Sequence, residues 1–228
     1  ADISCGCGSF LFDVAKKLKM SFDISYFEIF RDNLFGLDIQ SYSVTRAKLL
    51  LTLLALSEGE DVADFSYNLF VGNALSFKWE DNINDFNGFE IIVGNPPYVC
   101  SRNISEESKK LLNNWEVCKT GHPDLYIPFF QIGIENLAYS GILGYITMNT
   151  FFKSVNGRAL REYFQNNQYR LRIVDFGNNQ IFQSKSTYTC ICFIEKTDSS
   201  YIEFASSNEF FNDLSFNKIT SRTPTLPL

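Results

Sequence analysis

The sequence predicts an α/β fold, in which helices cover both faces of a mostly parallel sheet with one antiparallel strand. Short apolar runs alternate with segments of helical period along the chain, which is typical of strands joined by helical crossovers. With 228 residues, 45% of them hydrophobic, the chain can bury one sizeable core. We therefore expect a single α/β domain.

In the first part of the chain, one helical segment comes before the first short apolar strand, and a second helical segment separates that strand from the next. The second helix can be capped by Ser41 or Ser43, and Gly59 follows its end. Short apolar runs are typical of strands buried on both faces. In chain order we expect a helix over residues 9–19, a strand over 34–39, a helix from 41 or 43 to 56, and strands over 69–72 and 89–94.

The second part of the chain continues the alternation. Ser105 can start a polar helix, and the next helix has Pro128 near its first turn, where proline is tolerated, and Gly141 as its stop. Residues 187–195 alternate as a half-exposed antiparallel strand does. We expect helices over 106–115, 124–139 and 157–166, strands over 142–148, 171–176, 187–195 and 201–205, and a helical turn or two after the last strand.

Composition limits the function classes. The net charge of −6 gives no global attraction for nucleic acid, which counts against a complete DNA-binding protein but not against a catalytic core whose groove contacts come from another segment. No apolar stretch has the length of a membrane span, and the start shows no signal-peptide pattern. We expect a soluble, cytoplasmic protein without a membrane partner.

The six cysteines do not have the spacing of common zinc sites. Cys5/Cys7 and Cys190/Cys192 are C-x-C pairs, and His122 is the single histidine, so we expect no metal site. The second pair has strand period, which places both sulfurs on one buried face.

A carboxamide, a rigid bend and an aromatic ring follow the apolar run 89–94, at Asn95-Pro96-Pro97-Tyr98. Prolines fix φ and carry no N–H, so nearby carbonyls can face a ligand. The Asn95 oxygen and a proline carbonyl can accept both hydrogens of an exocyclic amine, while the Tyr98 ring stacks on the attached heterocycle. The alternative is an ordinary turn after a buried strand.

A second group of residues suits a nucleotide-like ligand. Gly6 and Gly8 permit close backbone approach just before a helix, and Asp38 ends an apolar strand, where its carboxylate can bind both ribose hydroxyls. Asn73 ends the next strand and can read a base edge. The spacing does not fit the NAD fingerprint. A glycine-rich turn and a turn-forming asparagine remain the alternatives.

In this order, the segments resemble the N6-adenine-specific DNA methyltransferases of the gamma arrangement, from type II and type IIG restriction-modification systems. Asp2 to Phe10 follows the family's first motif, D-P-A-C-G-S-G-x-F, with three substitutions. Gly36-Leu37-Asp38-Ile39 is similar to the acidic ribose motif, and Gly72-Asn73-Ala74-Leu75 to the third motif, where many members have Asp. The NPPY tetrapeptide is the catalytic motif as it stands, and Asp124-Leu125-Tyr126 matches the D-L-Y helix start.

The resemblance implies a Rossmann-like, S-adenosylmethionine-dependent methyltransferase that flips an adenine out of double-stranded DNA and methylates its N6. It implies that Tyr98 and Phe182 hold the flipped base. The implied catalytic residues are Asn95, Pro96, Pro97 and Tyr98, and the implied cofactor-binding residues are Asp2, Cys5, Gly6, Gly8, Phe10, Asp38, Ile39, Asn73, Ala74 and Asp124.

Three further interpretations stay open. A protein N5-glutamine methyltransferase or an RNA methyltransferase also uses Asn-Pro-Pro-Tyr on a planar amine, and a catalytically silent methyltransferase-like fragment is a third possibility. We expect residues 1–205 to form an N-terminally truncated catalytic domain and residues 206–228 to connect it to a target-recognition region. The missing N-terminal segment and the C-terminal recognition domain of the same parent chain are the expected partners.

Overall fold

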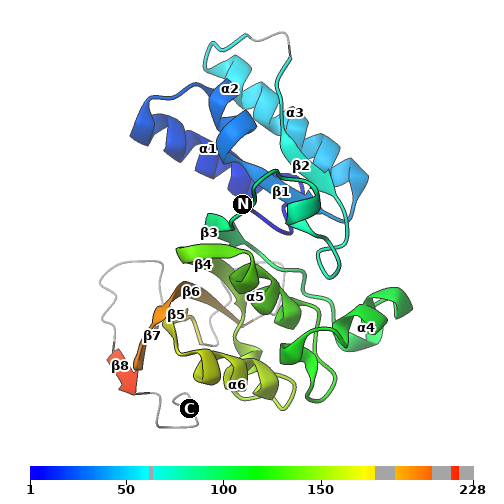
Figure 1. The fold of residues 1–228 in the computed structure, drawn as a ribbon, viewed down its shortest axis with the longest axis vertical. Helices are drawn as coiled ribbons and strands as arrows, with labels where there is room; N and C mark the ends of the chain where they lie inside the picture. Colours follow the sequence, from blue (N-terminus) through cyan, green and yellow to red (C-terminus); the bar gives the residue numbers. More distant parts are fainter. Residues whose placement is uncertain (62–63, 178–187, 207–216, 221–228) are drawn as a thin grey trace. The chain divides into compact units, whose positions relative to one another are not determined.

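The computed structural model describes residues 1–61, 64–177, 188–206 and 217–220 (Figure 1). The chain divides into two compact units, Ala1–Lys78 and Trp79–Leu228. Both units combine strands with helices, which confirms the α/β class. No helix within the described ranges is long and apolar enough to cross a bilayer.

The first unit is a small parallel sheet packed against two long helices. Strands β1 and β2 pair in parallel, and Asp2 adds an isolated parallel bridge beside Gly36. Apolar side chains of the two long helices form the core together with Leu34, which precedes β1, and Leu69, which lies in β2. In chain order the elements are α1 (Ser9–Phe22), α2 (Tyr26–Glu28), the π-helical η1 (Ile29–Asn33), β1 (Phe35–Asp38), α3 (Ser41–Ser57) and β2 (Asn68–Val71).

Gly8 shows why the loop before α1 is glycine-rich. Its φ is +88°, in the left-handed region that favours glycine. A Cβ at this position would lie 2.9 Å from the Cβ of Ala47 in α3. The glycine therefore allows both the turn into α1 and the close approach of the loop to α3.

The second unit contains a six-stranded sheet with the order β3-β4-β6-β5-β7-β8. Strand β6 is antiparallel to both neighbours, and β8 is antiparallel to β7. The sequence predicts one antiparallel strand, and β8, which lies inside the expected connector, is a second one. The strands are β3 (Phe89–Gly94), β4 (Leu137–Met148), β5 (Tyr169–Asp175), β6 (Thr189–Asp198), β7 (Tyr201–Ser206) and β8 (Asn217–Thr220).

Helices α5 and α6 pack on one face of this sheet through aromatic contacts. Phe130 of α5 contacts Tyr145 of β4 with ring centroids 5.7 Å apart, and it contacts Phe164 of α6 at 5.5 Å. The helical elements are η2 (Trp79–Asp81), η3 (Ser101–Asn103), α4 (Glu106–Leu112), η4 (Glu116–Cys118), α5 (Tyr126–Glu135), η5 (Asn149–Phe152) and α6 (Arg158–Asn167).

The expected boundary between α5 and β4 is wrong. The sequence predicts a helix to residue 139 with a stop at Gly141, but α5 ends at Glu135 and β4 begins at Leu137. Leu137 pairs with Phe89, and the Phe89 N–H donates to the Asn136 carbonyl at 2.8 Å, so pairing with β3 takes over the backbone there. Gly141 lies inside the strand, where a Cβ would approach the Phe89 carbonyl oxygen to 2.8 Å.

The expectation for the second cysteine pair is confirmed. Cys190 and Cys192 are both buried on β6, with their sulfurs 3.7 Å apart. The spacing of two residues on a strand explains their common face.

Candidate active site

In the first unit, the residues expected to bind a cofactor meet at the carboxyl ends of β1 and β2. The Asp38 carboxylate accepts the Gly6 N–H on Oδ2 at 3.0 Å and the Gln40 N–H on Oδ1 at 2.8 Å. Each oxygen keeps further acceptor capacity. Gly6 has φ +51°, and a Cβ there would meet nothing within 4 Å. A carboxylate beside an open glycine backbone fits the ribose hydroxyls of a nucleoside.

Asp2 is a buried carboxyl group in the same loop. Its backbone donates to Phe35 O and accepts from Leu37 N, both at 2.9 Å, which fixes it beside β1. Its Oδ1 accepts the Ser4 N–H at 3.0 Å. Burial raises the pKa of Asp2 from 3.8 to about 7, although the Ser4 hydrogen bond acts in the opposite direction. Asp2 is therefore partly protonated near neutral pH.

The other residues of this unit that we expect to bind the cofactor differ in which of their groups are exposed. The Cys5 thiol belongs to the apolar core, so only the backbone of Cys5 can face a ligand. Phe10, in the first turn of α1, and Ile39, directly after β1, are large apolar side chains that are 36% and 58% exposed. Ile39 offers apolar surface directly after Asp38 in the chain, whereas Ala74 is buried.

Asn73 builds the turn after β2. Its side-chain oxygen accepts the Leu75 N–H at 3.1 Å, and its carbonyl accepts the Ser76 and Phe77 N–H groups at 2.9 Å. This is the turn role that the sequence left open. The Gly72 N–H donates to the Asp38 carbonyl at 3.0 Å, so the same turn is tied to the end of β1.

In the second unit, Asn95-Pro96-Pro97-Tyr98 follows β3 directly. Asn95 is exposed and Pro96 is buried. The Tyr98 hydroxyl donates to the Ile146 carbonyl of β4 at 3.0 Å, which fixes one edge of the ring. Burial raises the pKa of Tyr98, so the phenol stays a neutral donor at physiological pH.

The chain just after this motif is held by the residues that precede α5. The Asp124 Oδ1 accepts the Ser101 N–H at 2.9 Å, and the Leu125 N–H donates to the Val99 carbonyl at 2.9 Å. Sequence reasoning gave Asp124 a cofactor role and did not predict this support, because the two segments are far apart in sequence. Phe182, the second expected base contact, lies outside the described residues.

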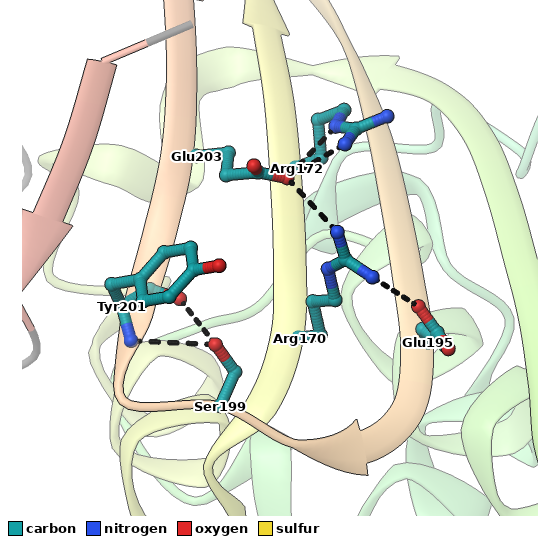
Figure 2. A network of polar contacts seen from close by, with 6 residues as sticks. All are labelled: Arg170, Arg172, Glu195, Ser199, Tyr201 and Glu203. Atoms are coloured by element: carbon teal, nitrogen blue, oxygen red, sulfur yellow. Dashed lines mark hydrogen bonds and ion pairs between the residues drawn. The ribbon is translucent and has the colours of Figure 1, made fainter.

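A separate polar network, which no sequence motif predicts, lies on the exposed face of the six-stranded sheet (Figure 2). Arg172 donates to Glu203 through Nε at 3.0 Å and Nη2 at 2.8 Å, and Arg170 donates to Glu195 at 3.2 Å. The charges of two arginines and two glutamates balance locally. These four residues, with Ile142 and Phe193, line a pocket of about 250 Å³.

The chain matches the model of a known protein family. The family model described as Eco57I restriction-modification methylase matches residues 32–182. The chain belongs to this family. Within the described ranges, the Eco57I-family chain has no cluster of three His, Cys, Asp or Glu side chains suited to a metal ion.

One curated relative is the type II restriction enzyme and methyltransferase RM.Eco57I of Escherichia coli, with 30% identity over 257 aligned residues. The alignment covers 92% of this chain but 26% of that protein, so the chain spans about a quarter of its relative's length.

Solved structures support the fold of this Eco57I-family member. The DrdV–DNA complex superposes with a TM-score of 0.73 at 15% identity, covering 96% of this chain and 26% of that one. A Listeria monocytogenes protein described as a class I S-adenosylmethionine-dependent methyltransferase has a TM-score of 0.67 at 14% identity, and the match covers 92% of this chain and 58% of that one. The family and the fold imply S-adenosylmethionine as the cofactor, and the Asp38 and Gly6 geometry fits its nucleoside.

Proposed function

We propose that this chain is the catalytic domain of a site-specific DNA methyltransferase, which transfers a methyl group from S-adenosylmethionine to N6 of adenine in double-stranded DNA. It would act in a restriction-modification or related defence system, in the cytoplasm. The observation that carries the proposal is the Asn95-Pro96-Pro97-Tyr98 segment at the carboxyl end of β3, anchored to β4 through Tyr98 and to Asp124 through Ser101.

In the proposed mechanism, the protein supplies positioning. An adenine amine is a poor nucleophile because its lone pair is delocalised into the ring. Acceptors at the Asn95 side chain and the Pro96 carbonyl favour the pyramidal amine in which that lone pair is available. The Tyr98 ring stacks on the base that has left the duplex. S-adenosylmethionine, when bound, supplies the methyl group.

The cofactor side of the proposal rests on the first unit. Asp38 would hold the ribose hydroxyls, and the Gly6 and Gly8 loop with Asp2 would seat the methionine part. Cys5, Phe10, Ile39, Asn73 and Ala74 would complete this side, and Asp124 would contribute next to α5. Phe182 would hold the flipped adenine opposite Tyr98. We assign residues 1–205 to catalysis and residues 206–228, in which β8 pairs with β7, to the connection with a target-recognition region.

The test is methyl transfer from labelled S-adenosylmethionine by the full-length protein, its Asn95→Ala variant and the matched control Asn113→Ala, an exposed asparagine at the end of α4. Unmethylated genomic DNA, total RNA and a protein extract are offered separately. We expect N6-methyladenine in DNA from the parent and the control, with a loss of about 100-fold or more in Asn95→Ala.

Each other outcome contradicts the proposal in a specific way. Label in glutamine side chains assigns the chain to the protein methyltransferases, and label in RNA assigns it to the RNA enzymes. Cofactor binding without transfer to any substrate indicates a catalytically silent domain.

A further inference from the structure

Three segments of the second unit carry basic side chains and no acidic ones. They are the chain that follows Tyr98, the turn before α5, and the stretch from the end of β4 into α6, which are residues 99–104, 118–123 and 149–161. Their basic side chains are Arg102, Lys119, Lys153, Arg158 and Arg161. The whole chain, by contrast, has 20 basic and 26 acidic residues. Positive charge is therefore concentrated in these segments, against the balance of the molecule.

Hydrogen bonds join the three segments to one another. The Ser101 N–H donates to Asp124 Oδ1 at 2.9 Å, which ties the chain after the Asn-Pro-Pro-Tyr motif to the turn before α5. The His122 N–H donates to Asn156 Oδ1 at 3.0 Å, and Thr120 Oγ1 accepts an N–H of the first turn of α6 at 3.1 Å. The segments therefore lie side by side, where the parallel strands β3 and β4 end.

Four of the five cations are exposed. We call these four side chains the basic rim, which consists of Arg102, Lys119, Lys153 and Arg158. No ion pair between residues of the described ranges involves any of the four. Two carboxylates directly follow the segments in sequence: Asp124, which is held by the Ser101 N–H, and the exposed Glu162. The rim is therefore a group of solvated cations without ion-pair partners.

Arg161 fixes the loop that carries Lys153. Its Nη1 donates to the Phe151 carbonyl at 2.5 Å and to the Ser154 carbonyl at 3.0 Å. Burial and the neighbouring charge of Arg158 lower the pKa of Arg161. The effect of Arg158 means that two like charges lie close together here, an arrangement that a bound anion stabilises.

We propose that the basic rim binds backbone phosphates of the DNA strand that carries the target adenine, an inference that rests on the function proposed above. Cations without local partners bind DNA phosphates and release their counterions. Such contacts fix the position and orientation of a protein on the duplex without reading its sequence. Because the rim adjoins the chain that follows Tyr98, it holds the strand next to the pocket into which the base is flipped.

The test uses the full-length protein with Lys119→Gln, Lys153→Gln, Arg158→Gln and the double variant Lys153→Gln/Arg158→Gln. Lys153→Arg keeps the charge, and Lys17→Gln is the matched control, because it removes the same charge from an exposed lysine of α1 in the first unit. The readouts are Kd values for a labelled unmethylated duplex pool and for total RNA between about 50 and about 200 mM salt. The kcat and KM for methylation of unmethylated genomic DNA and the melting temperature complete the set.

We expect each single neutralisation to reduce the slope of log Kd for the duplex against log salt by about 1, and the double variant by about 2, because fewer counterions are released. The KM for DNA should rise by about threefold or more per charge at about 50 mM salt and by less at about 200 mM. The kcat should stay within about twofold of the parent, because the contact is the same in the ground and transition states. Lys153→Arg and Lys17→Gln should match the parent.

Four results would overturn the inference. They are an unchanged salt slope in the neutralised variants, an equal change in Lys17→Gln, which marks an effect of total charge, a melting temperature that falls with the slope, which marks a structural role, and a loss confined to RNA binding, which assigns the rim to RNA. If the parent methylates adenine in DNA and one of these results appears, only the inference fails. If the slopes fall as expected but the parent transfers no methyl group, the phosphate contacts stand and the proposed function fails.

Discussion

Asp2 is a carboxyl group almost wholly removed from water in the loop before α1, and its pKa is raised by burial to about 7. Between about pH 4 and pH 7, the folded protein therefore holds a proton on Asp2 that the unfolded chain releases. Because the folded state binds more protons in this window, the contribution of Asp2 to stability falls as the pH rises toward 7 and stays low above it.

This linkage makes Asp2→Asn a stabilising change at high pH. Asparagine is neutral and can keep the acceptor for the Ser4 N–H, which Asp2 binds at 3.0 Å. The advantage of the variant over the parent should grow by roughly 1.4 kcal/mol per pH unit between pH 5 and pH 7 and then level off. Urea unfolding at pH 5, 6, 7 and 8 measures it, and a difference that is constant with pH would contradict a raised pKa.

The affinity for the cofactor should change in the opposite direction to the stability in this variant. If Asp2 seats the methionine part of the cofactor, the same Asp2→Asn variant loses affinity for S-adenosylmethionine while gaining stability at pH 8. Such a trade-off is common where a buried charged group serves a site.

At the scale of elements, the short helix α2 depends on a residue beyond the end of α3. The Glu60 carboxylate accepts the N–H groups of Tyr26 at 2.9 Å and Phe27 at 3.3 Å, and Lys19 donates to it at 3.0 Å. Burial would raise the pKa of Glu60, but these hydrogen bonds and the lysine charge outweigh burial and lower it. A lowered pKa means that the stabilisation is present above about pH 4.5 and is lost as the pH falls below it.

We therefore expect Glu60→Gln to lower the free energy of unfolding by about 1–2 kcal/mol at pH 7, since it weakens charge-assisted bonds to the first turn of α2. The deficit should shrink as the pH falls below about 4.5, where the parent carboxylate is protonated. Denaturant unfolding at pH 7 and pH 4 measures this, with Glu58→Gln, an exposed glutamate nearby, as the control. Equal losses in both variants would rule out the specific role.

The elements themselves were largely predictable, because periodicity is local. Helix α3 and strand β3 follow from their own side chains, and β3 has the expected bounds. The start of β4 was not predictable, because Leu137 becomes a strand residue only through pairing with Phe89, which is distant in sequence. Strand β8 pairs with β7 and likewise depends on a partner rather than on its own pattern.

The residue types of the candidate site were predictable from the sequence, but the hydrogen bonds that hold these residues in place were not. Asp38 beside Gly6 was expected from motifs that end a strand and begin a helix. The bonds from Ser101 to Asp124 and from His122 to Asn156 join segments 23 and 34 residues apart, and each joins a backbone amide to an ordinary side-chain oxygen. Such contacts have no sequence pattern of their own, so only the folded chain reveals them.

At the scale of the whole molecule, the net charge of −6 bears on how the chain would contact DNA in the proposed function. Phosphate contacts supply most of non-specific affinity, and they need clustered Lys and Arg. Arg170 and Arg172 are engaged by Glu195 and Glu203, so their charge is already compensated. The chain spans 26% of the length of its relative RM.Eco57I.

We therefore expect residues 1–228 alone to bind duplex DNA only non-specifically, with a Kd of about 1 μM or weaker at physiological salt. The full-length protein should bind its own site at least about a thousandfold more tightly, as specific complexes do. Fluorescence anisotropy on an unmethylated duplex pool, at two salt concentrations, separates the two cases, because few phosphate contacts give a shallow salt dependence. Nanomolar, sequence-specific binding by residues 1–228 would show that recognition lies within this chain.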